Sequence, residues 1–195
     1  MRITFGIFLM AMTAMVYGQK IKVEQGSLAA LKGETELNVE FTYDNMAVGK
    51  YDKEEDYIAD KKKSYNEKEA GTGDKWQTNW VEDRKNRYEP KLLELLNKET
   101  TVMGGDKPNA KYTMIFHTSF TEPGFNIGIT RKNANINAEA IFVETANRDK
   151  IVCKISIVAA QGGAAMGFDF DTGQRIMEAY AVCGKRLSGR IKEGK

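Results

Sequence analysis

The sequence predicts an α+β fold: a two-layer sandwich in which a mixed sheet of about four strands carries two or three helices on one face. Three observations support this prediction. Apolar residues alternate with polar ones near residues 36–43, 112–120, 136–144 and 151–158, as in half-buried strands. Apolar residues recur at helical spacing over residues 74–98 and 173–192. The helical connection between the first two strands is long enough for a right-handed crossover, so we expect that pair to be parallel.

The elements before the crossover are less regular. Residues 20–34 are expected to form a short strand and a loop, and residues 36–43 a half-buried strand. A charged insertion at about 50–73 is expected to form a solvated helix over 52–69, with Asp52 and Glu55 at capping-box spacing. A second capping box, Asp74 with Gln77, should open the major helix, which Pro90 should kink or split into 74–88 and 90–98.

The second half of the chain reads as strands followed by a helix. A bend is expected at residues 122–124 and a turn at 147–149, so the last two strands should form an antiparallel pair. A loop of small residues at 159–167 leads to a third capping box, Asp171 with Gln174, and to a helix over about 173–192. Its inward stripe is Ile176, Tyr180, Cys183, Leu187 and Ile191.

Residues 1–18 resemble a secretory signal peptide. Arg2 precedes an uncharged apolar run that is too short to span a bilayer, and the run ends in the small-residue pattern Val16-x-Gly18. We therefore expect cleavage after Gly18, a single α+β domain over 19–195, and a periplasmic or secreted protein. No later apolar run is long enough to cross a membrane. Gln19 stands where a lipid-anchored bacterial lipoprotein needs its first mature cysteine.

Charge and composition exclude several classes of function. The chain of 195 residues has 29 basic and 27 acidic side chains, and loss of Arg2 with the signal leaves a formal charge of +1. Such a balance lacks the concentrated basic field that nucleic acid requires, so no nucleic-acid partner is predicted. No cofactor and no metal site is predicted either, because His117 is the sole histidine and neither cysteine is near it in sequence.

The two cysteines, Cys153 and Cys183, are both expected to face the core. An exported protein can form a disulfide, and two cysteines permit one bridge. The C-x-x-C spacing of a redox pair is absent. A structural disulfide and two buried free thiols therefore both remain open.

Three local patterns contain residue types that can support catalysis or ligand binding. His117 and Ser119 share a strand face, but nothing supplies an orienting acid, so a partly exposed strand histidine is favoured over catalysis. The loop 162–167 lacks the spacing of a phosphate-binding motif. Asp169 and Asp171 suggest a calcium loop only weakly, and Asp171 is better explained as a helix cap.

The clearest candidate binding residues are aromatic. Trp76, Trp80 and Tyr88 recur along the major helix and, with Tyr57 and Tyr65, could form a platform on which sugar rings stack. The same stripe continues into leucines, which favours ordinary core packing over a glycan site. No pair of carboxylates suited to glycoside hydrolysis can be chosen from the sequence alone, so no catalytic residue is predicted.

Several phrases resemble small bacterial envelope proteins with the fold of the TolB amino-terminal domain and of the curli secretion-channel family. They are residues 110–112, residues 141–145 and Tyr180-x-x-Cys183-Gly184-Lys185-Arg186-Leu187, and the resemblance covers roughly residues 35–193. It implies an α+β module that serves envelope assembly or protein contacts without an enzyme site. The leading hypothesis is therefore an exported, non-enzymatic module that binds an envelope or surface protein. The alternative is a glycan-binding protein or hydrolase that uses Trp76 and Trp80.

Overall fold

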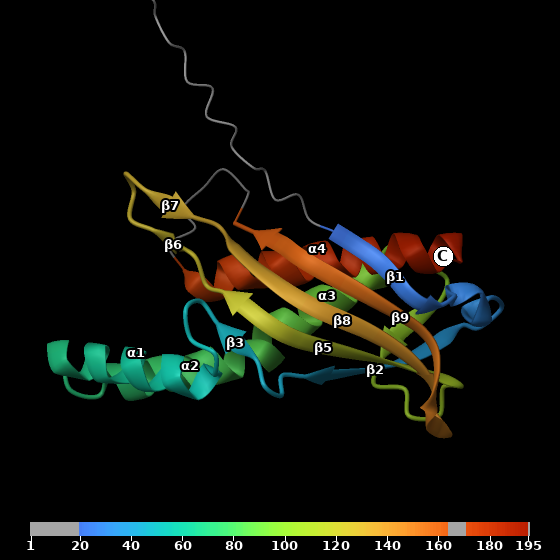
Figure 1. Ribbon diagram of the computed structural model, residues 1–195, viewed down its shortest axis with the longest axis horizontal. Coiled ribbons are helices and arrows are strands. Elements are labelled where there is room, and N and C mark those ends of the chain that lie inside the picture. The colour runs from blue at the N-terminus through green and yellow to red at the C-terminus, as the bar shows by residue number, and fades with distance from the viewer. Residues whose placement is uncertain (1–19, 164–170, 195) are drawn as a thin grey trace, which may run out of the picture.

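The computed structural model describes residues 20–163 and 171–194, so the predicted signal peptide and its cleavage site after Gly18 lie outside the described residues. The described chain forms a seven-stranded sheet in the order β1-β9-β8-β5-β2-β4, with β3 beside β5 (Figure 1). Its strands are β1 (Lys20–Gly26), β2 (Glu36–Thr42), β3 (Ala47–Val48), β4 (Met103–Gly105), β5 (Tyr112–Glu122), β8 (Ala134–Glu144) and β9 (Asn147–Gly162). A separate two-stranded sheet joins β6 (Phe125–Asn126) to β7 (Arg131–Lys132).

The sheet is mixed, as the sequence predicts. Strand β2 runs parallel to β5 across the helical connection, while β5, β8, β9 and β1 pair antiparallel in turn. The expected number of about four strands is too low. Strand β1 coincides with the short strand expected near residue 20, but β3 and β4 have two and three residues. Segments this short carry no measurable hydrophobic period, so only the tertiary pairing reveals them.

The helices form two groups. The chain contains α1 (Glu54–Lys68), α2 (Thr72–Asp83), α3 (Glu89–Leu96) and α4 (Thr172–Glu193), together with a 3-10 turn (Leu28–Leu31) and a π-helical turn (Arg84–Tyr88). Helix α4 lies along the sheet over β8 and β9 and packs against α3. Helices α1 and α2 pack on each other and extend past the edge of the sheet (Figure 1). The charged segment expected near 50–73 is therefore an ordered helix with one packed face.

Two of the three predicted capping boxes are wrong. Helix α1 starts after Lys53, and α2 starts after Gly71 in a left-handed conformation; neither cap makes a side-chain hydrogen bond. The turn between them sets the start of α2, because the Thr72 hydroxyl donates to the carbonyl of Tyr65 and the amide of Gly73 donates to Asn66. These tertiary bonds replace the capping function of the predicted Asp74.

The predicted cap of the last helix is confirmed. The Asp171 side chain accepts a hydrogen bond from the backbone N–H of Gln174 at 3.2 Å, as an N-cap residue does. The predicted break near Pro90 is confirmed as well. It takes the form of the π-helical turn before α3, and Pro90 sits in the first turn of that helix, where its missing N–H breaks no bond.

Strand β9 continues past its expected end at residue 158 and reaches Gly162. The register of the β8–β9 pair shifts between Ile136 and Ala138, and Ala159 adopts a positive φ of 53°. The side-chain oxygen of Asn137 accepts the Ala159 N–H at 2.8 Å. This bulge lets pairing continue to Gly162, so Gly163 is the one residue of the predicted small-residue loop that the structure describes outside the strand, and residues 164–167 lie outside the described residues.

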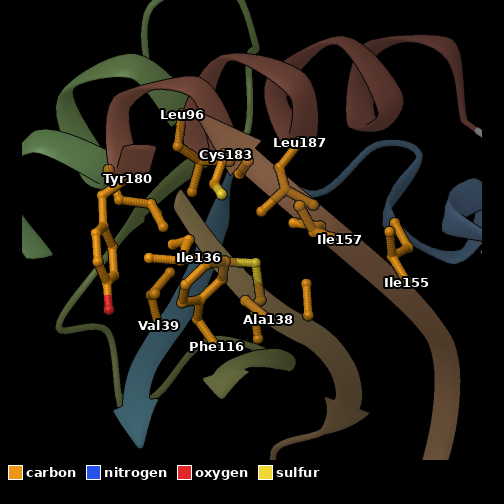
Figure 2. Close-up of a cluster of buried hydrophobic side chains, with 14 of the residues drawn as sticks. Val39, Leu96, Phe116, Ile136, Ala138, Ile155, Ile157, Tyr180, Cys183 and Leu187 are labelled. Carbon is orange, nitrogen blue, oxygen red and sulfur yellow. The ribbon is translucent and has the colours of Figure 1, made fainter. Parts of the chain in front are cut away.

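The core lies between the sheet and α4. Figure 2 shows Tyr180, Cys183 and Leu187 of α4 pointing toward the sheet, where they meet side chains such as Phe116 and Ile157. The predicted inward stripe of α4 is confirmed, because all five of its residues are buried. Burial of these apolar side chains contributes roughly 1.5–3 kcal/mol each.

Candidate functional site

An aromatic cluster holds α1 and α2 together. The rings of Trp76 and Trp80 stack with centroids 5.7 Å apart and an interplanar angle of 26°. Tyr57 of α1 packs edge-on against Trp76 at 5.7 Å and tilted against Trp80 at 5.0 Å, and Tyr65 contacts Trp76 at 5.8 Å. Helical spacing of four residues places both indoles on the face that α1 covers. Tyr57 and Trp80 belong to the main hydrophobic core and Trp76 packs against it, so the cluster extends that core between α1 and α2.

Glu54 fixes the position of the inner indole. The Trp80 Nε1–H donates to Glu54 Oε1 at 2.6 Å, and the Arg84 guanidinium donates to both oxygens of the same carboxylate. Trp80 is only 7% exposed, whereas Trp76 is half-buried. Arg84 also stacks on the ring of Tyr43, with the guanidinium carbon 4.2 Å from the ring centroid.

A groove of about 540 Å³ runs beside this cluster. It lies between the exposed side of α2, the π-helical turn and the first residues of α4. It is lined by Tyr65, Trp76, Asn79, Trp80, Glu82, Asp83, Asn86, Arg87, Asp171, Thr172 and Gly173. The groove thus combines an aromatic wall with amide, carboxylate and guanidinium groups.

One arginine joins two carboxylates at the α4 end of the groove. Arg87 Nε lies 3.0 Å from Asp83 Oδ1, and Arg87 Nη1 lies 2.8 Å from Asp171 Oδ2. Burial raises the pKa of Asp83 above its usual value, although Arg87 opposes this. Burial also disfavours the charged form of Asp171, but the hydrogen bonds from Arg87 and Gln174 outweigh it and hold the pKa of Asp171 below its usual value.

Gly173 allows this close approach of α4 to the π-helical turn. A Cβ at position 173 would lie 2.1 Å from Asp83 Oδ2 and 2.8 Å from Arg87 Nη1. Both distances are shorter than any ordinary contact, so a side chain at this position would displace the carboxylate.

The structure separates the three residues that the sequence grouped as candidate ligand contacts. Trp76 and Trp80 line the groove, but Tyr88 does not. Tyr88 is buried and stacks on Tyr180, with centroids 5.1 Å apart and an interplanar angle of 14°. Burial, with a smaller contribution from Asp83, raises the pKa of Tyr88, and its hydroxyl has no hydrogen-bond partner among the described residues. The grouping is therefore corrected to two tryptophans, and ligand binding by them stays a prediction.

The other candidate residues make contacts within the fold. His117 is a half-buried strand histidine whose Nδ1 lies 3.0 Å from the Thr42 hydroxyl, and the Ser119 hydroxyl donates to the carbonyl of Asn137. Cys153 and Cys183 are buried free thiols in this structure, not a disulfide. Burial raises the pKa of both thiols. Of the weak calcium motif, Asp169 lies outside the described residues, and no group of three metal-binding side chains occurs within them.

An exposed apolar hairpin tip is a feature that the sequence reasoning missed. The β6–β7 hairpin extends the β5–β8 pair beyond the end of the sheet (Figure 1). Ile129 is 95% exposed, Ile127 66% and Phe125 42%. The turn is held by its own hydrogen bonds, including the Ile127 N–H to the Thr130 carbonyl at 3.0 Å. The apolar side chains are therefore exposed on an ordered turn. The sequence signal for this tip is the apolar residue at every second position from Phe125 to Ile129, next to a segment with the charged residues Arg131 and Lys132.

No helix among the described residues is long and apolar enough to span a membrane. Neither a protein-family model nor a curated protein matches the chain. Two solved structures from Paraburkholderia phytofirmans, the PelC dodecamer and a variant of it, are similar with TM-scores of 0.43 and 0.37 and 9% sequence identity. The matches cover 89% and 85% of this chain and 97% of those chains. Likeness at these TM-scores carries no argument about what this chain does.

Proposed function

We propose that this chain is an exported, non-enzymatic binding or assembly module of the bacterial envelope, which contacts a partner protein through the tip of the β6–β7 hairpin. The observation that carries the proposal is the exposure of Phe125, Ile127 and Ile129 on one projecting hairpin. Single exposed apolar side chains are common on protein surfaces, but clustered exposed apolar residues mark contact sites. Arg131 and Lys132 follow the tip, so its base is polar.

The patch also indicates the kind of contact. Three side chains expose a few hundred Å² of apolar surface, whereas a standard protein interface buries roughly 800 Å² per partner. The hairpin is therefore one contact in a larger assembly and does not by itself hold a stable pair. This agrees with the envelope-assembly role that the sequence resemblance implies.

The experiment is site-specific photo-crosslinking in bacterial cells that produce the protein. A photoreactive residue at position 129 should give discrete adducts with one envelope protein. The same residue at position 63, on the exposed side of α1, should give none. The serine substitution Ile127→Ser should remove the adducts while leaving the melting temperature unchanged. Equal labelling from positions 129 and 63 would contradict the proposal.

A second candidate function is carbohydrate binding by Trp76 and Trp80. The groove beside the aromatic cluster favours it, because sugar sites combine an aromatic face with planar polar side chains. Both carboxylates at its end are bound by Arg87, which suits holding a ligand better than transferring protons, so hydrolysis is not proposed. Quenching of tryptophan fluorescence by oligosaccharides tests this candidate. The signal should be lost in Trp76→Ala, and its absence in the natural protein would exclude carbohydrate binding.

A further inference from the structure

The polar end of the groove can discriminate between classes of sugar. We infer that the groove selects uncharged oligosaccharides and rejects acidic ones, a specificity set by Asp83, Arg87 and Asp171. This inference rests on the carbohydrate-binding candidate and specifies its ligand class.

The lining of the groove has a net negative charge. Three carboxylates, Glu82, Asp83 and Asp171, line the groove against a single guanidinium, that of Arg87. Neither Trp76 nor the two asparagines contribute charge. A ligand that carries a carboxylate, sulfate or phosphate would therefore bring its charge toward a net negative wall, within the distance over which salt does not fully screen it.

The guanidinium of Arg87 is already bound by two carboxylates. Its Nε pairs with Asp83 Oδ1 at 3.0 Å, and its Nη1 pairs with Asp171 Oδ2 at 2.8 Å. An arginine that reads an acidic sugar must present a free fork to the ligand carboxylate. Here that fork is held by two carboxylates from different elements, one at the end of α2 and one at the cap of α4. Recruiting Arg87 to a ligand would leave Asp83, which is partly buried, without its counter-charge.

The groove is also lined by neutral side chains that can form hydrogen bonds. Asn79 of α2 and Asn86 of the π-helical turn are exposed and line the groove, and neither side chain has a hydrogen-bond partner among the described residues. Each amide can donate to one sugar hydroxyl and accept from another. Carboxylate oxygens bound to Arg87 keep lone pairs for further hydroxyl donors. These groups suit a ligand rich in hydroxyls and free of charge.

The side chains that line the groove are held in position by contacts within the protein. Trp76 stacks on Trp80, which is itself fixed by Glu54, so the aromatic wall is fixed in position. Asp171 is fixed by its cap bond to Gln174, and Asp83 is held against Gly173. Groups fixed in this way lose little freedom on binding, which favours a weakly interacting ligand such as a neutral sugar.

The test compares matched ligands. The probes are hexamers of the gluco, galacto and manno series, each paired with its uronate, which differs only by a carboxylate at C6. Affinities are measured by tryptophan fluorescence and calorimetry at low and moderate salt. We expect at least one neutral hexamer to bind tenfold or more tightly than its uronate, with the ratio falling as salt rises.

A charge-neutralising variant separates the inference from the general candidate. Asn is as good a helix cap as Asp, so Asp171→Asn should keep the fold while reducing the preference for the neutral hexamer about threefold to tenfold. Glu67→Gln, on the exposed side of α1 and away from the groove, is the matched control and should leave the ratio unchanged. Equal or tighter binding of the uronates overturns this inference alone. Failure of every hexamer to bind overturns the carbohydrate candidate with it.

Discussion

Two glycines in α4 should respond to the same substitution with opposite signs. Gly184 and Gly189 both lie in the helix interior, where replacement of glycine by alanine is worth about 1 kcal/mol of helix propensity. Their surroundings differ. A Cβ at position 184 would lie 2.3 Å from the carbonyl oxygen of Leu92 and 3.1 Å from the amide nitrogen of Leu96, whereas position 189 has nothing within 4 Å.

The magnitude follows from these distances. The atoms opposite Gly184 belong to the backbone of α3, so they cannot swing aside as a flexible side chain would. Ordinary contact begins near 3.4 Å, so Gly184→Ala must separate the two helices by roughly 1 Å. Overpacking of this kind costs about 1–3 kcal/mol beyond the propensity gain. We expect Gly184→Ala to lower the melting temperature by about 4–8 °C and Gly189→Ala to raise it by about 2–4 °C.

The assay is urea and thermal unfolding of the protein, followed by circular dichroism, with the two variants measured beside the natural protein. The sign matters more than the size, because helix propensity alone predicts that both variants are stabilised. If Gly184→Ala is as stable as the natural protein or more stable, then α3 and α4 do not approach as closely as described.

Three further predictions concern charge and thiols. Glu54→Gln should lower the free energy of unfolding by about 2 kcal/mol, because the largely buried Arg84 loses its counter-ion; an unchanged urea midpoint would contradict this. Glu40 has a pKa held below its usual value by Arg148, so its contribution is present above the unfolded pKa and lost as pH falls through the folded one. Glu40→Gln should therefore reduce the loss of stability between neutral and acidic pH, measured as the shift of the urea midpoint; an equal shift in both proteins would argue against it. Cys153 and Cys183 should resist thiol reagents until the protein unfolds, and a reductant should leave the melting temperature unchanged; a drop on reduction would indicate a bridge.

The part of the fold that the sequence predicts well depends on long periodic segments. Strands β5 and β8 and the inward stripe of α4 each repeat their pattern over many residues, so burial on one face leaves a clear signal. The parallel pairing of β2 with β5 follows from the length of the helical connection. The predicted cap at Asp171 succeeds because its hydrogen bond is made within one turn of chain.

The predictions that fail depend on contacts between different secondary-structure elements. Asp74 has capping-box spacing, yet the start of α2 is set by hydrogen bonds to α1, from the Gly73 amide to Asn66 and from the Thr72 hydroxyl to the Tyr65 carbonyl. Tyr88 shares the helical spacing of Trp76 and Trp80, but the π-helical turn rotates it away and it stacks on Tyr180. Periodicity assumes a uniform helix, and one residue of slippage changes which face a side chain occupies.

The candidate site shows the same division. The sequence by itself identified Trp76 and Trp80 as the residues to examine, because aromatic spacing along a helix is a local property. Only the tertiary structure brings Asp83 and Arg87 to Asp171, which is more than eighty residues away, and leaves Ile129 exposed at the hairpin tip. The physical reason is that periodicity records which face of an element is apolar, whereas a groove or an uncovered tip depends on where whole elements are placed.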